Sequence, residues 1–392
     1  MNALRFAGQL LARVLAVAIM LIAILALAVK LRYGGGHANF PDRSGEPRLP
    51  ESALEVVAEL PTPPGNIAVA PDGRVFVTLH PEAHPDLKVV ELVGGKMKPF
   101  PSAAFQDQRE EPEGFDNVLS IRIDRQNRLW ALDNGTHGLH PARLLAFDLD
   151  SGALAHEFTF PREIAGVGSH LNDFQVSNDG AHIFIADASF FAKTPALIVY
   201  DVGAHRARRI LQGDKSVTPE FFTPVVDGRS MELFGLISLR PGVDSIALKR
   251  GGGWLAYGAV TSSKMYVIPT LSLLNEKLSP DELERRVKTY ADKTMSDGLT
   301  TDDRDNIYLT DPEHSSIVVL RGADQKLATL VKSDKLLRWP DGFSFGPDGW
   351  LYVSCSALNE VLGRTASQIR DHAPYYVLRI KPGAGLTATP GQ

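Results

Sequence analysis

Asparagine and aspartate residues recur in this chain at the start of a repeated sequence pattern. Each is followed by an alternating apolar and polar run, a turn rich in Asp, Asn and Gly, and a second apolar run. Carboxylate and amide oxygens are the ligands that hard cations such as Ca²⁺ prefer. If the copies converge in the fold, they form an oxygen-rich site for a metal ion or a polar ligand. The residues are Asn66, Asn117, Asn172, Asp173, Asp244, Asp297 and Asp341.

The competing explanation for each copy is structural. Asp and Asn at the start of a strand also form turns with their own backbone, and a repeat multiplies one such habit into several apparent ligands. The hypothesis of a site therefore depends on the whole set. Asp297 and Asp341 carry the most weight, because each precedes a glycine and follows a small or rigid residue (Ser296 and Pro340).

Six copies of the pattern, spaced by roughly 45 to 70 residues, predict an all-β, six-bladed β-propeller. The alternation has the period of two that half-buried strands show. If the first strand of a blade runs along the channel and the second runs back, the start of one and the end of the other share a face. That face also gathers the following residues: His80, Asp133, His170, Asp187, Asp311 and His314.

Within this ring we expect Asn172, Asp297 and Asp341 to share a cation or polar ligand at the mouth of the channel, since each begins an innermost strand. Three such groups without a partner would repel one another or stay hydrated. Four neighbours are candidate ligand-binding residues, although aromatic side chains at such positions are more often core. They are Asn117, Asp173, Phe174 and Phe343.

The predicted propeller spans residues 51–385. Leu54 to Leu60 is a strand without a partner nearby in sequence, and we expect it to close the ring by pairing with Tyr375 to Ile380. Gly213 to Gly235 is an irregular insertion before the weak copy at Asp244. Ser279 to Glu282 has the form of a capping box and predicts a short helix.

An apolar run from Val14 to Val29 precedes the repeats, with basic residues on both sides. It is marginal in length for a bilayer span and long for the core of a signal peptide. Residues 1–33 are therefore expected to be a signal or signal-anchor segment, with retention favoured over cleavage, and residues 34–50 a flexible tether. The body would then be extracytoplasmic, periplasmic or secreted, and would meet the membrane only through this N-terminal segment.

The composition excludes several classes of function. The chain has 392 residues with a formal net charge of −5 and no cluster of Lys and Arg, which argues against nucleic acid as a partner. Cys355 is the only cysteine, so neither an intramolecular disulfide nor a cysteine-rich zinc site can form. Sequence motifs for a nucleophile elbow, a phosphate-binding loop or a zinc-protease helix do not occur.

The chain resembles the major royal jelly proteins and the insect yellow proteins, as a bacterial relative of them. The resemblance runs from about Gly65 to Asn359, and it implies a secreted, six-bladed propeller. Paired cysteines typical of the insect proteins are absent. The resemblance is carried by Asp124–Asp133 (DRQNRLWALD), Ala142–Asp148 (ARLLAFD), Phe184–Ala188 (FIADA), Leu197–Asp201 (LIVYD), Phe234–Leu236 (FGL), Val260–Pro269 (VTSSKMYVIP) and Leu337–Asp341 (LRWPD).

Asp297-Gly298-Leu299 is similar instead to the calcium-dependent gluconolactonase and paraoxonase propellers, in which an Asp at this place binds metal. That similarity implies Ca²⁺ as a cofactor, with Asp297 as a ligand. It extends less directly to Asn172, and least to Glu113, whose spacing from the first strand does not clearly match.

Three functions follow, in order of preference. The first is a monomeric propeller that binds a small aromatic or amine-bearing molecule at the channel mouth, where acids and aromatic rings suit a cation. The second is a calcium-dependent lactone or ester hydrolase, with His170, His314 or a carboxylate as the general base. The third is a membrane-anchored scaffold that binds proteins through its loops. Fold alone does not separate them.

Overall fold

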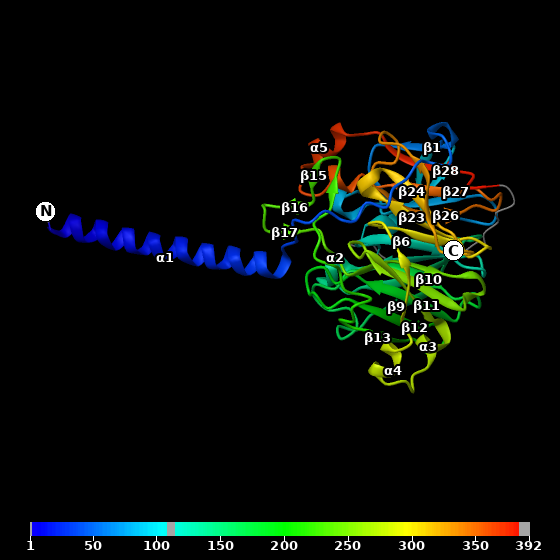
Figure 1. Ribbon diagram of the computed structural model, residues 1–392, viewed down its shortest axis with the longest axis horizontal. Helices are drawn as coiled ribbons and strands as arrows, with labels where there is room; N and C mark the ends of the chain where they lie inside the picture. The colour runs from blue at the N-terminus through cyan, green and yellow to red at the C-terminus, as the bar shows by residue number, and fades with distance from the viewer. Residues whose placement is uncertain (1, 108–113, 384–392) are drawn as a thin grey trace.

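The structure is a computed structural model that describes residues 2–107 and 114–383. Figure 1 shows a body of β-sheets with one long helix projecting from it. Six four-stranded antiparallel sheets form the ring, which confirms the six-bladed propeller. The innermost strands contact one another in a closed circle, β2–β6–β10–β18–β22–β26 and back to β2. Helix α1 (Asn2–Tyr33) is the projecting element.

Each of the first three blades is a meander of four consecutive strands. Blade one is β2 (Pro64–Val69), β3 (Val75–Leu79), β4 (Val89–Val93) and β5 (Lys96–Pro99). Blade two is β6 (Val118–Ile123), β7 (Arg128–Asp133), β8 (Arg143–Asp148) and β9 (Leu154–Thr159). Blade three is β10 (Leu171–Val176), β11 (His182–Asp187), β12 (Ala196–Asp201) and β13 (Arg206–Ile210).

The last three blades include the one that closes the ring. Blade four is β18 (Val243–Leu248), β19 (Trp254–Ala259), β20 (Lys264–Pro269) and β21 (Lys288–Asp292). Blade five is β22 (Leu299–Thr301), β23 (Ile307–Asp311), β24 (Ser316–Leu320) and β25 (Leu327–Lys332). Blade six is β26 (Pro340–Phe345), β27 (Leu351–Cys355) and β28 (Tyr375–Ile380), with β1 (Glu55–Leu60) as its outer strand.

Ring closure by the N-terminal strand is confirmed. β1 pairs antiparallel with β28, from Glu55 opposite Arg379 to Leu60 opposite Tyr375. An ion pair of 2.7 Å between Arg379 and Glu55 reinforces one end of the pairing. This strand covers the edge of β28, which would otherwise offer unpaired backbone groups to other chains.

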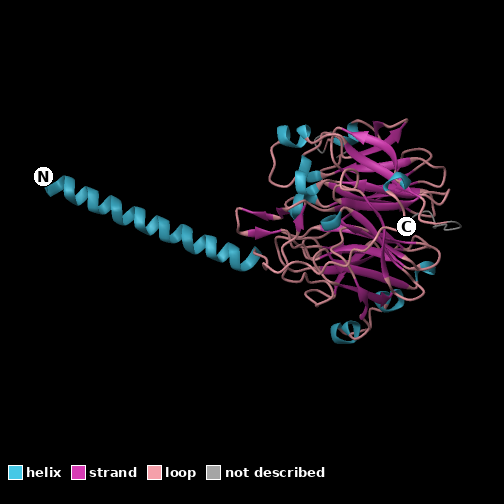
Figure 2. Ribbon diagram, turned by 45° about the horizontal axis from the view of Figure 1, so that its top comes forward, coloured by secondary structure: helices cyan, strands magenta, loops and turns pink. Residues whose placement is uncertain are grey.

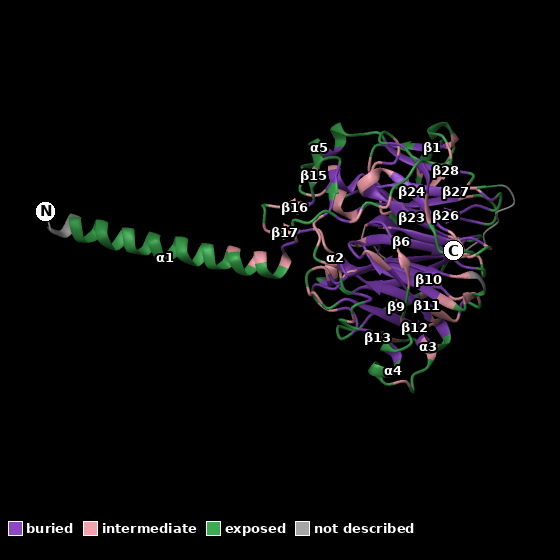
Figure 3. Cartoon of the chain, in the orientation of Figure 1, coloured by how far each residue is buried: buried purple, intermediate pink, exposed green. Residues whose placement is uncertain are grey.

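The core lies between neighbouring blades. Every residue of the inner strands β2, β6, β10 and β18 is buried, because each strand is enclosed by the adjacent blades. Outer strands such as β9 alternate between exposed and half-buried residues. Figure 3 shows this gradient, with buried strands inside and exposed loops around them. Large rings such as Trp130, Tyr200 and Phe174 fill the space between blades two and three.

Short elements decorate the ring. Two hairpins, β14 (Val225–Val226) with β15 (Arg229–Ser230) and β16 (Glu232–Leu233) with β17 (Ile237–Ser238), lie in the insertion between blades three and four. Figure 2 shows them beside the base of α1. The predicted capping box is confirmed at the start of α4. The other short helices are α2 (Gly135–Gly138), α3 (Thr270–Leu274), α4 (Pro280–Glu284) and α5 (Ala366–Asp371).

The segment between α1 and β1 lies along the propeller. Phe40 is buried and packs edge-on against Phe222, with 5.0 Å between ring centroids. The backbone N–H groups of Arg48 and Leu49 donate to β25. These contacts differ from the expectation of a flexible tether, because an aromatic side chain and ladder-like hydrogen bonds hold the segment in place.

Candidate functional site

The recurring Asn and Asp residues lie at irregularities of the innermost strands. In five blades the pairing between the first and second strands shifts register near the start of the first strand. A bulge of this kind leaves a residue out of the ladder and re-aims its side chain. Asn66, Asn172, Asp173, Asp244 and Asp341 all lie within these shifts. The bulges therefore turn polar side chains toward the channel mouth.

Hydroxyl groups on the second strands accept hydrogen bonds from backbone N–H groups near the starts of the first strands. Thr78 Oγ1 accepts from the N–H of Asn66 at 2.7 Å. Thr310 Oγ1 accepts from the N–H groups of both Asp297 and Gly298 at 2.9 Å. The close approach at Gly298 requires glycine, because a Cβ there would lie 1.7 Å from the carbonyl oxygen of Asp341.

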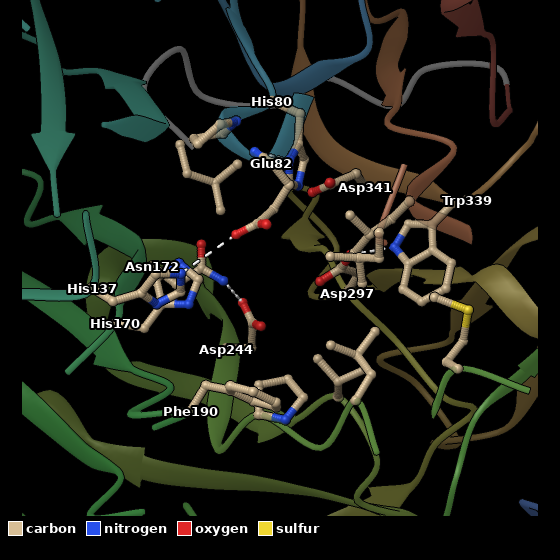
Figure 4. Close-up of a pocket in the computed structure, with 18 of the residues that line it drawn as sticks. His80, Glu82, His137, His170, Asn172, Phe190, Asp244, Asp297, Trp339 and Asp341 are labelled. Atoms are coloured by element: carbon tan, nitrogen blue, oxygen red, sulfur yellow. Dashed lines mark hydrogen bonds and ion pairs between the residues drawn. The ribbon is translucent and has the colours of Figure 1, made fainter. Parts of the chain in front are cut away.

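We call the face on which the innermost strands begin the mouth face. A cavity of about 180 Å³ opens there, and Figure 4 shows the side chains that line it. The structure brings Asn117, Asn172, Asp173, Asp297 and Asp341 together in this one cavity, as the strand positions predict.

Four carboxylates, which we call the acidic floor, lie at the base of the cavity: Asp173, Asp244, Asp297 and Asp341. Burial and the charge of neighbouring floor carboxylates raise the pKa of Asp244 and Asp341 well above the usual value. Burial raises the pKa of Asp297 to about 6, against the hydrogen bond from the Trp339 indole at 2.5 Å. The floor is therefore short of positive charge.

Two buried cations balance part of this charge. The Arg122 guanidinium lies 3.7 Å from Asp173, which also accepts from Asn66 at 2.8 Å and Ser120 at 3.0 Å. Lys293 is fully buried, and its ammonium donates to the carbonyl of Val260 at 3.2 Å. Burial lowers the pKa of Lys293 to about 7. Asp173 is thus tied into a network, and its charge adds to the raised pKa of each of the other three floor carboxylates.

A histidine cluster forms a second side of the cavity. It consists of His80, Glu82, His137 and His170, and Figure 4 shows it opposite Trp339. The rings of His137 and His170 are 4.4 Å apart, and His137 Nε2 lies 3.4 Å from Glu82 Oε1. Burial lowers the pKa of His80 to about 4 and that of His170 to about 3. The hydrogen bond from His137 lowers the pKa of Glu82 to about 2. The buried imidazoles of His80 and His170 are therefore neutral near pH 7.

A lid covers the cavity. We define it as residues 224–241, which include the two hairpins β14–β15 and β16–β17. It contributes apolar side chains to the lining, among them Met231, Leu233 and Ile237. Arg229 fastens it to the β27–β28 loop by a 2.7 Å bond to the carbonyl of Leu362. Sequence patterns did not predict this cover, because its hairpins are only two residues per strand.

Other predicted site residues lie elsewhere. His314 lies outside the cavity: its Nδ1 is 3.0 Å from Asp311, and its Nε2 is 3.3 Å from Asp42 of the N-terminal segment. Phe174 and Phe343 are buried in the cores between blades, because adjacent residues of an inner strand face alternate sides. Glu113 lies outside the described residues.

Two carboxylates at second-strand ends hold the backbone rather than face the cavity. Asp133 accepts from the N–H groups of Asp116 and Asn117 at 2.9 Å and pairs with Arg143 at 2.9 Å. Asp187 accepts from the N–H of His170 at 2.8 Å and pairs with Arg209 at 2.6 Å. For these residues the structural explanation of the repeat is the better one.

Whether the acidic floor can hold a calcium ion depends on how many of its oxygen atoms approach one point. Calcium takes six to eight oxygen ligands at about 2.3 to 2.6 Å. Across residues 2–107 and 114–383, no group of three or more His, Cys, Asp or Glu side chains is placed to hold a metal ion. The acidic floor has the right donor chemistry, but its oxygens are spread around the channel. As they lie, these residues do not fit calcium.

The sheets and the mouth cavity define a six-bladed β-propeller with a cavity at one end of its channel. The sequence model described as "Major royal jelly protein" matches residues 117–376. The chain belongs to the major royal jelly protein family. It is 24% identical over 231 residues to major royal jelly protein 9 of Apis mellifera, covering 54% of this chain and 52% of that protein. Major royal jelly protein 1 of Apis mellifera is 26% identical over 192 residues, covering 45% and 42%.

The chain thus spans about half the length of the curated relatives it matches. Two solved structures share the fold at low identity. Regucalcin of Agrobacterium tumefaciens, a calcium-binding protein, has a TM-score of 0.54 and 13% identity, covering 88% of this chain and 97% of that one. A gluconolactonase of Xanthomonas campestris has a TM-score of 0.52 and 12% identity, covering 83% and 88%.

Proposed function

We propose that this protein binds, outside the cytoplasm, a small molecule that combines a positive charge with an apolar body, such as an arylalkylamine. The observation that carries the proposal is the acidic floor. Burial raises the pKa of all four floor carboxylates, and repulsion from neighbouring carboxylates adds to the shifts of Asp244, Asp297 and Asp341. A bound ammonium group would relieve that repulsion and stabilise the ionised carboxylates.

The walls above the floor favour an organic cation over a hydrated ion. Phe190 and Phe191 line one side of the cavity, and apolar lid side chains line another. Ligand sites are generally apolar with a few placed polar groups, and aromatic faces attract organic cations. His80 and His170, whose pKa burial lowers to about 4 and about 3, add hydrogen-bonding groups without adding positive charge.

Calorimetry of the full chain with phenethylamine tests this proposal. We expect binding of the amine at pH 7.5 and none of the neutral alcohol of the same skeleton. Asp297→Asn should weaken binding about tenfold, the size of a single charge-assisted contact of roughly 1.4 kcal/mol. Asp150→Asn, which removes an exposed carboxylate on the far side of the ring, is the matched control.

Equal binding of amine and alcohol, or equal loss in the two variants, would contradict recognition of the charge. Binding of neither compound, in a folded protein and across a panel of aryl and alkyl amines, would exclude the amine class.

The second candidate is a calcium-dependent hydrolase of lactones or esters. Its support is the donor chemistry of the floor, together with the likeness in fold to a calcium-binding regucalcin and a gluconolactonase. Against it stand the dispersed oxygens and the low pKa of His170, which makes this histidine a poor proton acceptor. Melting in the presence of Ca²⁺, with a screen of lactones and aryl esters, separates the candidates. A calcium-dependent rise in Tm and hydrolysis that Asp297→Asn abolishes would favour this one.

A further inference from the structure

Helix α1 joins the propeller at the mouth face. Lys30 Nζ lies 2.5 Å from Glu232 Oε1 and 2.7 Å from the carbonyl of Gly235, both in the lid. Arg32 donates to the carbonyl of Ala192 at 2.9 Å, in the β11–β12 loop that also contributes to the cavity wall. Figures 1 and 2 show the helix leaving this side of the ring and pointing away from the sheets.

The helix is suited to a bilayer along its length. The stretch Arg5–Tyr33 is long and apolar enough to cross a membrane, and none of its most apolar window is buried against the propeller. Lys30 follows the apolar run Val14 to Val29 directly. Because Lys30 contacts the lid, the lid lies at the level where such a helix leaves the hydrocarbon and enters the headgroup region.

Exposed apolar side chains gather on the same face. Outside α1, ten large hydrophobic residues are exposed in the described chain. Six of them belong to loops of the mouth face: Leu139, Val167, Phe191, Phe221, Val225 and Phe234. Phe234, at the tip of the β16–β17 hairpin, is 92% exposed. Its neighbour Gly235 supplies the carbonyl that Lys30 contacts, so the most exposed ring of the group stands beside the helix.

Two basic side chains of the mouth face lie over aromatic rings. Lys193 lies 4.4 Å from the ring centroid of Phe190, and Arg240 lies 4.6 Å from that of Phe221. Long basic side chains interleaved with aromatic rings suit the boundary between hydrocarbon and anionic headgroups. The burial of single apolar residues there is favourable, as in peripheral membrane proteins.

We propose that the mouth face lies against the bilayer surface, with α1 as the span and Phe234 of the lid inserted at the interface. The cavity then opens toward the membrane. This proposal does not depend on which ligand the cavity holds. The occupant of the apolar surface is the lipid bilayer rather than another protein, because the surface surrounds the exit of a membrane-length helix.

Depth measurement in vesicles tests the proposal. The full chain, reconstituted in phosphatidylcholine and phosphatidylglycerol vesicles, carries an environment-sensitive fluorophore at Phe234→Cys or, as the matched control, at Leu271→Cys. Leu271 is 80% exposed in the β20–β21 loop, on the opposite face of the ring. The native Cys355 is buried, and burial raises its pKa, so labelling of the unmodified chain measures a small background.

We expect a lipid-borne quencher to reduce the emission at position 234 at least threefold more than at position 271, and aqueous iodide to show the reverse order. Equal lipid quenching at the two positions would overturn the proposal. Protection of position 234 from iodide without lipid quenching would also overturn it, and would indicate a protein partner or a second copy of the chain. Both positions are exposed, so neither substitution removes a core contact.

Discussion

Asp297 shows how one hydrogen bond sets the charge of the candidate site. Burial and the charge of Asp173 raise the pKa of this carboxyl, whereas the indole N–H of Trp339 lowers it, with a result of about 6. The indole is itself buried and held within the core. Asp297 therefore changes its charge between mildly acidic and neutral pH, whereas Asp244 and Asp341 take up a proton more readily still.

Replacing Trp339 with Phe should raise the pKa of Asp297 above about 6, because the donor is lost. A carboxyl whose pKa is raised by folding contributes stability at low pH, and that contribution is lost as pH rises through the folded-state pKa. In the wild type the loss due to Asp297 falls between about pH 4 and pH 6, and in the variant it should extend to higher pH. The carboxyl ¹³C shift of Asp297, followed by NMR across this range, measures the midpoint.

Trp350→Phe is the matched control, since Trp350 lies in the β26–β27 turn on the opposite face, beside Arg379. It should leave the midpoint unchanged. An unchanged midpoint in Trp339→Phe would show that the indole does not set the charge of Asp297.

At the scale of single residues, the sequence predicted the acidic part of the site together with His80 and His170, and it missed Glu82 and His137. Asn172, Asp297 and Asp341 could be placed because each begins a strand of a repeat, where position alone fixes direction. Glu82 and His137 lie in loops of unrelated length, and His137 adopts the left-handed backbone region (φ 55°), so no periodicity predicts them. The sequence HPEAH after the second strand of blade one was the available signal for Glu82.

At the scale of elements, the ring depends on the pairing of β1 with β28. Deleting residues 2–60 should abolish cooperative thermal unfolding or cause aggregation, because it leaves β28 as an open edge and removes buried Ala58 and Leu60. Deleting residues 2–36 should preserve a cooperative transition, since Phe40 and β1 remain. Calorimetry and size-exclusion chromatography of both proteins measure the difference.

A cooperative, monomeric protein after the longer deletion would show that β1 is dispensable. A collapse after the shorter deletion would show instead that contacts of α1 with the lid are needed for folding.

The repeat made most of the elements predictable, and its departures mark where prediction ended. Blade four is the weakest copy of the sequence repeat, because its turn is the glycine run Gly251 to Gly253. In its second strand, Gly258 leaves room for the side chain of Lys293. The lid has no period of its own, so its position over the cavity became visible only in the structure. The membrane orientation of the helix was ambiguous from the sequence, because basic residues lie on both sides of the apolar run. In the structure, Lys30 and Arg32 bind the propeller.

At the scale of the whole molecule, α1 predicts the compartment of the propeller. We expect alkaline phosphatase fused after Gln392 to be active in cells, and a fluorescent protein that folds only in the cytoplasm to be dark at the same position. Changing Val17, Leu21 and Leu25 to Asp should reverse both results, because three charges near the centre of the span prevent insertion. Fluorescence from the unmodified fusion would contradict an extracytoplasmic location.

Closure by β1 also has a consequence for the order in which the chain is made. Glu55 and Arg379, which pair across the closing strands, are 324 residues apart, so the first strand to be synthesised waits for the last. Until then the blades can stack as an open array, with two unpaired edges and no finished cavity. Helix α1 precedes β1 by about twenty residues. With α1 as the membrane span proposed above, the waiting strand would stay near the membrane surface, where the final blade must arrive to complete the ring.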